Sequence, residues 1–121
     1  MFINFSNHPS DRWDKSQLNA ASKWGEIVDI SFPNVDPAMS EQDIAGLATE
    51  YIEKILSYSP DAVMCQGEFT LSYTVISQLV KKGITVVAAC SKRVVNEKLV
   101  DGVQQKEVIF SFEQFRQYKD K

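Results

Sequence analysis

Two short segments of the chain, 62–65 and 84–89, consist almost entirely of apolar residues. Each has the length of a β-strand, and the segment 71–82 between them has apolar residues at helical spacing. Strands that are apolar at every position are covered on both faces, which is typical of a parallel sheet with helices on its two sides. These segments therefore predict an α/β fold.

Helix and strand signals alternate through the rest of the first ninety residues. We expect strands at 2–5 and 26–32 and a short helix at 15–24. A longer helix has apolar residues at helical spacing from Ile44 to Leu56, with Ser40 as its cap. We expect a doubly wound sheet of order 2-1-3-4. Right-handed crossovers in such a sheet place the first helix on one face and the next two on the other.

The last thirty residues have a different pattern. Asp101-Gly102 lies between Val100 and Val103, a strong signal for a β-hairpin, with strands expected at 94–100 and 103–110. Ser111 is the expected cap of a short helix at 112–118. The predicted fold is thus a single α/β domain, 1–121, with a mostly parallel sheet, a C-terminal hairpin and a final short helix.

The balance of charge excludes some partners. Thirteen basic and sixteen acidic residues give a net charge of -3, so duplex DNA is not an expected partner. No apolar run approaches the roughly 20 residues that span a bilayer, so no membrane association is expected. The first residues lack the pattern of a secretion signal, and we expect a cytoplasmic protein.

Cysteine and histidine usage indicates a site without a metal or other cofactor. Cys65 and Cys90 lie in apolar runs without CxxC spacing, which favours reduced core thiols over a metal or redox site. His8 is the sole histidine, which excludes a multi-histidine metal site. Its imidazole could act as a hydrogen-bond donor or general acid, or only shape the loop beside Pro9.

Polar residues follow three of the expected strands at their carboxyl ends. In a doubly wound sheet these ends meet where the winding reverses, and ligands bind there. The residues are Ser6, Asn7 and His8 after the first strand, Gln66, Gly67, Glu68, Phe69 and Thr70 after the third, and Ser91, Lys92 and Arg93 after the fourth. We expect them to line one ligand site.

Several of these residues have two interpretations. Gly67 permits a close approach of backbone to ligand, and the helix after Thr70 offers free N–H groups to a phosphate. Lys92 and Arg93 would grip phosphate, or form a solvated charge pair. Glu68 would be a general base or ribose ligand, or only cap the helix.

Three aromatic residues are candidates for stacking on a nucleobase: Trp13, Trp24 and Phe69. For Trp24, packing in the core is the favoured interpretation. Phe69 interrupts a polar loop, and stacking is the favoured role there.

Several short strings resemble a known family. They are Asn4-Phe-Ser-Asn-His8, Gln66-Gly-Glu-Phe-Thr-Leu-Ser-Tyr73, Cys90-Ser-Lys-Arg93, Asp101-Gly102, Val108-Ile-Phe110 and Phe115-Arg-Gln-Tyr118. In this order they resemble the small CARF-like CRISPR-associated ring nucleases. The chain departs from that pattern at Asn7, which is inserted before His8, and at Phe112, where a polar residue or histidine is expected.

The resemblance implies a Rossmann-like homodimer that binds cyclic oligoadenylate, in particular cyclic tetra-adenylate, across its two-fold axis. It also implies cleavage of the ring without metal, or alternatively a module that senses or sequesters the ring without turnover. The catalytic candidates are His8, Glu68, Lys92 and Arg93. The ligand-binding candidates are Ser6, Asn7, Gln66, Gly67, Phe69, Thr70 and Ser91.

Overall fold

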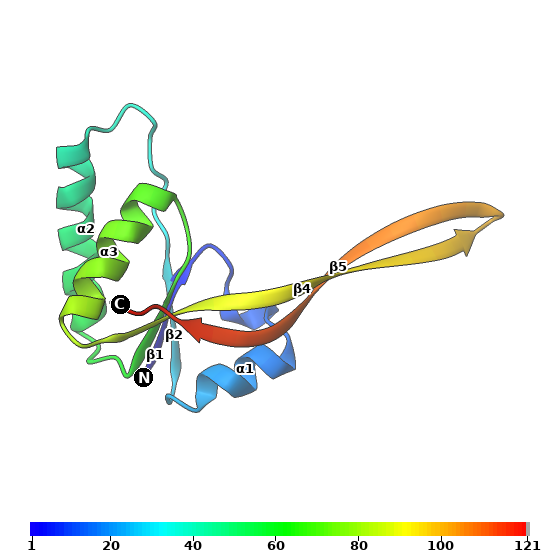
Figure 1. Ribbon diagram of the computed structural model, residues 1–121, viewed down its shortest axis with the longest axis horizontal. Coiled ribbons are helices and arrows are strands. Elements are labelled where there is room, and N and C mark those ends of the chain that lie inside the picture. Colours follow the sequence, from blue (N-terminus) through cyan, green and yellow to red (C-terminus); the bar gives the residue numbers. More distant parts are fainter. Residues whose placement is uncertain (121) are drawn as a thin grey trace.

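The computed structural model describes residues 1–120, which form three helices, one short 3-10 helix and five strands. In chain order these are β1 (Phe2–Ser6), the 3-10 helix η1 (Ser10–Arg12), α1 (Lys15–Ser22), β2 (Ile27–Ser31), α2 (Glu41–Leu56), β3 (Ala62–Cys65), α3 (Phe69–Lys81), β4 (Thr85–Val100) and β5 (Val103–Gln117). All five strands belong to one mixed sheet of order β2-β1-β3-β4-β5 (Figure 1).

The first four strands are parallel and follow the predicted order 2-1-3-4. The sheet differs from the prediction in its fifth strand, β5, which pairs with β4 in the antiparallel sense. One apolar cluster joins one face of the sheet to α2 and α3, and includes Phe5 and Val63. A second, smaller cluster on the other face includes Phe2, Met64 and Ala21 of α1. The predicted division of the helices between the two faces is therefore also confirmed.

The start of α2 shows why this helix is clear in the sequence. Ser40 accepts a hydrogen bond from the Asp43 backbone N–H, and the Asp43 carboxylate accepts one from the Ser40 N–H. This reciprocal capping box satisfies two donors that a helix start otherwise leaves free. Among residues 1–120, no helix combines the length and apolar character needed to cross a bilayer.

The fourth strand is much longer than predicted. β4 is continuous through Ser91, Lys92 and Arg93, so the loop expected there is wrong. The predicted turn at Asp101-Gly102 is confirmed, since both residues have positive φ and Val100 pairs with Val103. The outer halves of β4 and β5 project from the body as a two-stranded ribbon, shown in yellow and orange in Figure 1. We call residues 91–111 the arm.

The helix predicted at 112–118, with its cap at Ser111, is also wrong, because this segment belongs to β5. The pairing of β4 with β5 shifts register between Cys90 and Ser91, as in a β-bulge. The bulge brings Phe112 and Phe115 to one side of the strand, with ring centroids 4.9 Å apart. Apolar residues three apart thus imitate the spacing of a helix.

Both cysteines are free, as predicted, and Cys65 is buried whereas Cys90 is half-buried. Burial raises the pKa of the Cys65 thiol to about 12, against a smaller lowering by the neighbouring Ser72 hydroxyl. The Cys65 thiol is therefore protonated near neutral pH, and a protonated thiol is a poor nucleophile.

Candidate functional site

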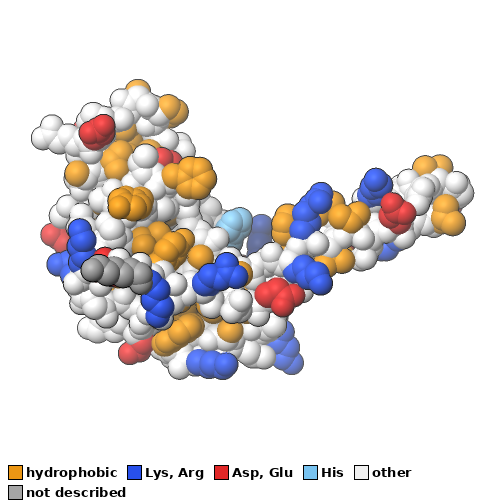
Figure 2. Space-filling model, in the orientation of Figure 1, with side chains coloured by type: hydrophobic (Ala, Val, Ile, Leu, Met, Phe, Trp, Pro, Cys, Tyr) orange, Lys and Arg blue, Asp and Glu red, His pale blue; other side chains and the backbone are white. Residues whose placement is uncertain are grey.

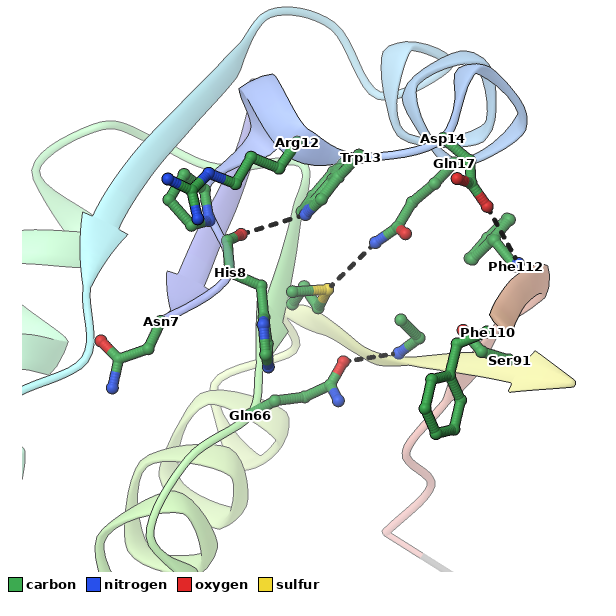
Figure 3. Close-up of a pocket in the computed structure, with 13 residues that line it drawn as sticks. Asn7, His8, Arg12, Trp13, Asp14, Gln17, Gln66, Ser91, Phe110 and Phe112 are labelled. Atoms are coloured by element: carbon green, nitrogen blue, oxygen red, sulfur yellow. Dashed lines mark hydrogen bonds between the residues drawn. The ribbon is translucent and has the colours of Figure 1, made fainter. Parts of the chain in front are cut away.

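A cavity of about 530 Å³ opens where β1, β3 and β4 reach the same edge of the sheet. Its floor is the sheet, and its walls are the loop after β1, the start of α1 and the base of the arm (Figure 3). The residues that line it are Asn7, His8, Pro9, Arg12, Trp13, Asp14, Gln17, Met64, Gln66, Ala89, Ser91, Phe110 and Phe112. We call this space cavity 1.

A second cavity of about 450 Å³, cavity 2, lies toward α3. Its lining is Asn7, His8, Cys65, Gln66, Gly67, Phe69, Ser72, Ala88 and Tyr118. The Ser72 hydroxyl is buried next to the Cys65 thiol. Burial raises the pKa of Tyr118, and cysteine thiolates formed at high pH would raise it further, so its hydroxyl remains a donor at neutral pH. Cavity 2 therefore offers the Tyr118 hydroxyl to a ligand, whereas the Ser72 hydroxyl is buried in its wall.

The two cavities share Asn7, His8 and Gln66. Two of the predicted strand-end clusters thus meet as expected, and Ser91 joins them in cavity 1. The His8 imidazole is exposed and has no hydrogen-bond partner among residues 1–120. It lies above Gln66, so both side chains can contact a ligand in either cavity (Figure 3).

The backbone of His8 is held in place from several directions. Its carbonyl oxygen accepts hydrogen bonds from Asn4 Nδ2 at 2.9 Å and from Trp13 Nε1 at 3.0 Å. Its N–H donates to Ser6 Oγ at 3.2 Å. Ser6 is buried and acts here as a support for the loop, although it was predicted as a ligand contact. The loop that presents the imidazole is therefore fixed on both sides of His8.

The buried amide of Asn4 connects this loop to the neighbouring strand. Asn4 and Asp29 are register partners of β1 and β2, and Asn4 Nδ2 donates to Asp29 Oδ1 at 2.9 Å. Ser6 Oγ donates to Asn4 Oδ1 at 2.6 Å, and Asp29 accepts from the backbone N–H and hydroxyl of Ser10. Asn4 therefore uses both ends of its amide to order the loop.

Gln66 joins the two strands at the cavity floor. Its Oε1 accepts a hydrogen bond from the Ala89 N–H at 2.9 Å, where β4 has continued past the end of β3. A backbone donor at the inner edge of the sheet is thereby satisfied. Since Oε1 is engaged, Nε2 is the end of the amide that is available to a ligand.

Gly67 is required by packing against Phe32. A Cβ atom at this position would lie 2.5 Å from the ring of Phe32, which is buried and stacked on Phe5 at 4.7 Å between centroids. Neither ring can move aside easily. The close approach that we predicted for Gly67 is thus toward an aromatic side chain of the protein.

This contact gives a stability prediction. Gly67→Ala should lower the free energy of unfolding by about 1 to 2 kcal/mol, because the added methyl group forces the Phe32 ring to shift. Urea denaturation followed by circular dichroism measures the change. Gly46→Ala is the contrasting variant, since a Cβ at Gly46 meets nothing within 4 Å, and in the interior of α2 it should raise the free energy of unfolding by about 0.5 to 1 kcal/mol. Wild-type stability of Gly67→Ala would show that the Phe32 contact is unimportant.

Glu68 caps α3. Its carboxylate accepts hydrogen bonds from the backbone N–H groups of Thr70 at 3.0 Å and Leu71 at 2.8 Å, and from the Thr70 hydroxyl. These groups are the donors that we expected to meet a phosphate. The backbone hydrogen bonds, first that of Leu71 and then that of Thr70, hold the pKa of Glu68 below its ordinary value of 4.5.

Stability should consequently depend on the ionisation of Glu68. Its folded-state pKa is below the unfolded value, so the stabilisation is present above about pH 4.5 and is lost as the pH falls through the folded-state pKa. Glu68→Gln should cost about 1 kcal/mol at pH 7. The difference in melting temperature from the wild type should shrink toward pH 3. A difference that stays constant over this range would contradict the capping role.

Lys92 and Arg93 lie outside both cavity linings, because β4 continues as a strand. Alternation along β4 places Arg93 on the same face as Ser91. Arg93 pairs with Phe110, which lines cavity 1, so its backbone lies at the outer end of that cavity. Lys92 lies on the opposite face.

Trp24 packs against Phe2 in the smaller apolar cluster, which confirms the core role that was favoured for it. Phe69 is 89% exposed at the edge of cavity 2, and its stacking on a nucleobase stays a prediction. Trp13 contacts Phe2 and also lines cavity 1.

Several lining residues were missed by the sequence analysis. They are Arg12, Asp14, Gln17, Met64, Phe110 and Phe112, together with Asn4 and Asp29 behind the loop. Asn4 and Asp29 could have been found from the sequence, since each is the single polar residue inside an otherwise apolar strand core. Phe112 could not have been found in this way. Its backbone N–H donates a hydrogen bond to the carboxylate of Asp14, 98 residues earlier in the chain.

Comparison with known proteins adds one finding. A search of curated proteins finds no match to the chain. A family model described as the Uncharacterized protein MJ1673 family matches residues 1–116. Since the match extends over the parallel sheet, cavity 1 and the arm, the chain belongs to the MJ1673 family.

Proposed function

We propose that the protein is a ring nuclease with a Rossmann-like, CARF-like domain. It binds cyclic tetra-adenylate at a homodimer interface and cleaves it without metal, which would switch off type III CRISPR signalling. The observation that carries this proposal is the pair of cavities sharing His8 and Gln66 at the strand ends. The family resemblance of the sequence supplies the identity of the ligand.

The lining of cavity 1 suits a nucleotide. Trp13, Phe110 and Phe112 offer aromatic surfaces to a base. Arg12 offers a cation, and Gln17 and Gln66 offer amides. A chain with a net charge of -3 needs a local cluster of positive charge and hydrogen-bond donors to hold an anion. Asn7, Gly67, Phe69, Thr70 and Ser91 remain the other proposed ligand contacts.

Cleavage would proceed by an internal displacement. The ribose 2'-hydroxyl attacks the adjacent phosphorus and gives its proton to solvent water, the bond from phosphorus to the 5'-oxygen breaks, and that oxygen takes up a proton. The products are a 2',3'-cyclic phosphate and a free 5'-hydroxyl on a linear oligoadenylate. The protein aligns the groups, His8 donates the proton to the leaving oxygen, and Arg93 stabilises the negative charge.

The test is a cleavage assay in EDTA. Purified protein is incubated with cyclic tetra-adenylate, and products are separated by chromatography and identified by mass. The proposal predicts linear products ending in a 2',3'-cyclic phosphate. An intact ring after prolonged incubation, despite measurable binding, would overturn the catalytic proposal.

A binding module is the second candidate, and the position of the charged groups favours it. The Glu68 carboxylate is engaged at the start of α3, and Lys92 and Arg93 lie outside the linings of both cavities. A site of this kind could sense or sequester the ring without turnover. Tight binding without products in the same assay would support this candidate.

The two basic residues of β4 provide a matched pair of variants. Arg93→Ala should weaken binding of cyclic tetra-adenylate by about 1 to 3 kcal/mol, as expected for loss of a charge-assisted phosphate contact. Lys92→Ala, on the other face, should have a smaller effect. Titration calorimetry at a fixed salt concentration measures both. Equal losses of affinity in the two variants would show that only net charge matters. Unchanged affinity in both variants would show that neither residue belongs to the site.

A further inference from the structure

The arm has apolar side chains on both of its faces. Val95 pairs with Val108 on one face, and Val94 pairs with Ile109 on the other. Toward the tip, Leu99 is 79% exposed and Val103 62% exposed. Figure 2 shows hydrophobic side chains, in orange, along the arm to its end.

An isolated ribbon of this kind has little stability of its own. A two-stranded hairpin in water is marginal unless a further strand or a packed layer covers it. Within the arm, the polar interactions are a salt bridge from Lys98 to Glu107 at 3.0 Å and a hydrogen bond from Gln104 to Glu97 at 2.6 Å. Both pairs are exposed, so they add little. The arm therefore needs a partner that covers both faces.

We infer that this partner is a second copy of the chain, with the arm of each protomer buried against the other. At about 3.3 Å per residue, the segment 91–100 extends roughly 33 Å, and a ribbon about 10 Å wide presents roughly 330 Å² on each face. One arm inserted into an unrelated protein would bury about 660 Å², less than the roughly 800 Å² per partner of a stable interface. Reciprocal exchange doubles the buried area, because each protomer gives one arm and receives another.

Charge complementarity favours the same partner. Residues 1–90 contain eleven acidic and six basic side chains, whereas the arm, residues 91–111, contains three acidic and four basic ones. An arm with excess positive charge is thus attracted to the acidic body of another protomer. The inference deepens the homodimer part of the proposed function, and it does not depend on the ligand or on cleavage.

The experiment uses the full chain without ligand and measures its mass by light scattering and sedimentation. The wild type should be a discrete dimer. Val95→Lys and Ile109→Lys, one on each face, should each weaken dimerisation about 100-fold or more. Thr49→Lys places the same charge on the exposed surface of α2 and should leave the dimer unchanged.

A shortened variant tests the arm without introducing charge. Arg93 and Phe110 are register partners, so an Asn-Gly turn can replace residues 94–109 between them. This variant should be a folded monomer. If it fails to fold, the single lysine variants decide the question.

A monomeric wild type, a dimer that the lysine variants do not weaken, or open-ended oligomers would each overturn the inference. A stable dimer that leaves cyclic tetra-adenylate intact would instead overturn the catalytic proposal alone. Cleavage of cyclic tetra-adenylate by a monomeric protein would overturn the inferred dimer and leave the catalytic proposal standing.

Discussion

His8→Ala should lower the turnover of cyclic tetra-adenylate by about 100- to 10,000-fold, the usual range for loss of a positioned general acid. The imidazole is exposed and has no hydrogen-bond partner among the described residues, so its removal should leave the fold intact. The melting temperature should accordingly stay within about 1 °C of the wild-type value, since exposed side chains contribute little to stability. Single-turnover cleavage and thermal melting measure the two effects separately.

His8→Gln is the informative companion variant. Its amide can still donate a hydrogen bond to the ligand, but it cannot transfer a proton. Binding should therefore be retained while turnover is lost. Normal turnover in both variants would remove His8 from the reaction, and a large fall in melting temperature would assign it a structural role instead.

Asn4→Leu should lower the free energy of unfolding by about 2 to 4 kcal/mol. The side chain is almost completely buried, and its loss deprives the His8 carbonyl, Asp29 and Ser6 of their partner. Each polar group left without a partner costs about 1 to 3 kcal/mol, with water replacing part of the loss at the exposed Asp29. Urea denaturation measures the change.

The same variant should also reduce cleavage, because the loop that presents His8 loses its main anchor. Asn4→Asp retains the shape but replaces the donor with a second carboxylate beside Asp29, and it should be at least as harmful near neutral pH. The control is Asn34→Leu, at an exposed position in the loop after β2. An Asn4→Leu protein as stable and active as the wild type would show that the network does not position the loop.

The parallel part of the fold could be predicted because its signals are local. Ser40 and Asp43 cap α2 within four residues, and the apolar segment 62–65 forms β3. For the assumed strand order, the handedness of the crossovers fixes which face of the sheet each helix covers. These features do not depend on contacts between distant parts of the chain.

The C-terminal part could not be predicted in the same way. The polar sequence of residues 91–93 fits a loop as well as a strand. In the arm, which projects from the body, both faces of the strand can hold polar side chains. The bulge near Cys90 gives Phe112 and Phe115 a helical spacing inside a strand. Pairing with β4, a tertiary contact, decides the structure of this segment.

For the candidate site, the sequence identified the strand ends but not all of their roles. His8 and Gln66 meet as expected, because parallel strands end at the same edge of the sheet. The supporting roles of Ser6, Gly67 and Glu68 depend on the rotamers of neighbouring side chains, which no sequence pattern specifies. Their polar or small character suited a ligand site and a structural role equally well.

A crystal structure of the protein with bound cyclic tetra-adenylate would test the central claim most directly. We expect an adenine in cavity 1 against Trp13, with a phosphate within hydrogen-bond distance of His8 and Gln66. Ligand density elsewhere on the surface, with both cavities empty, would contradict the account.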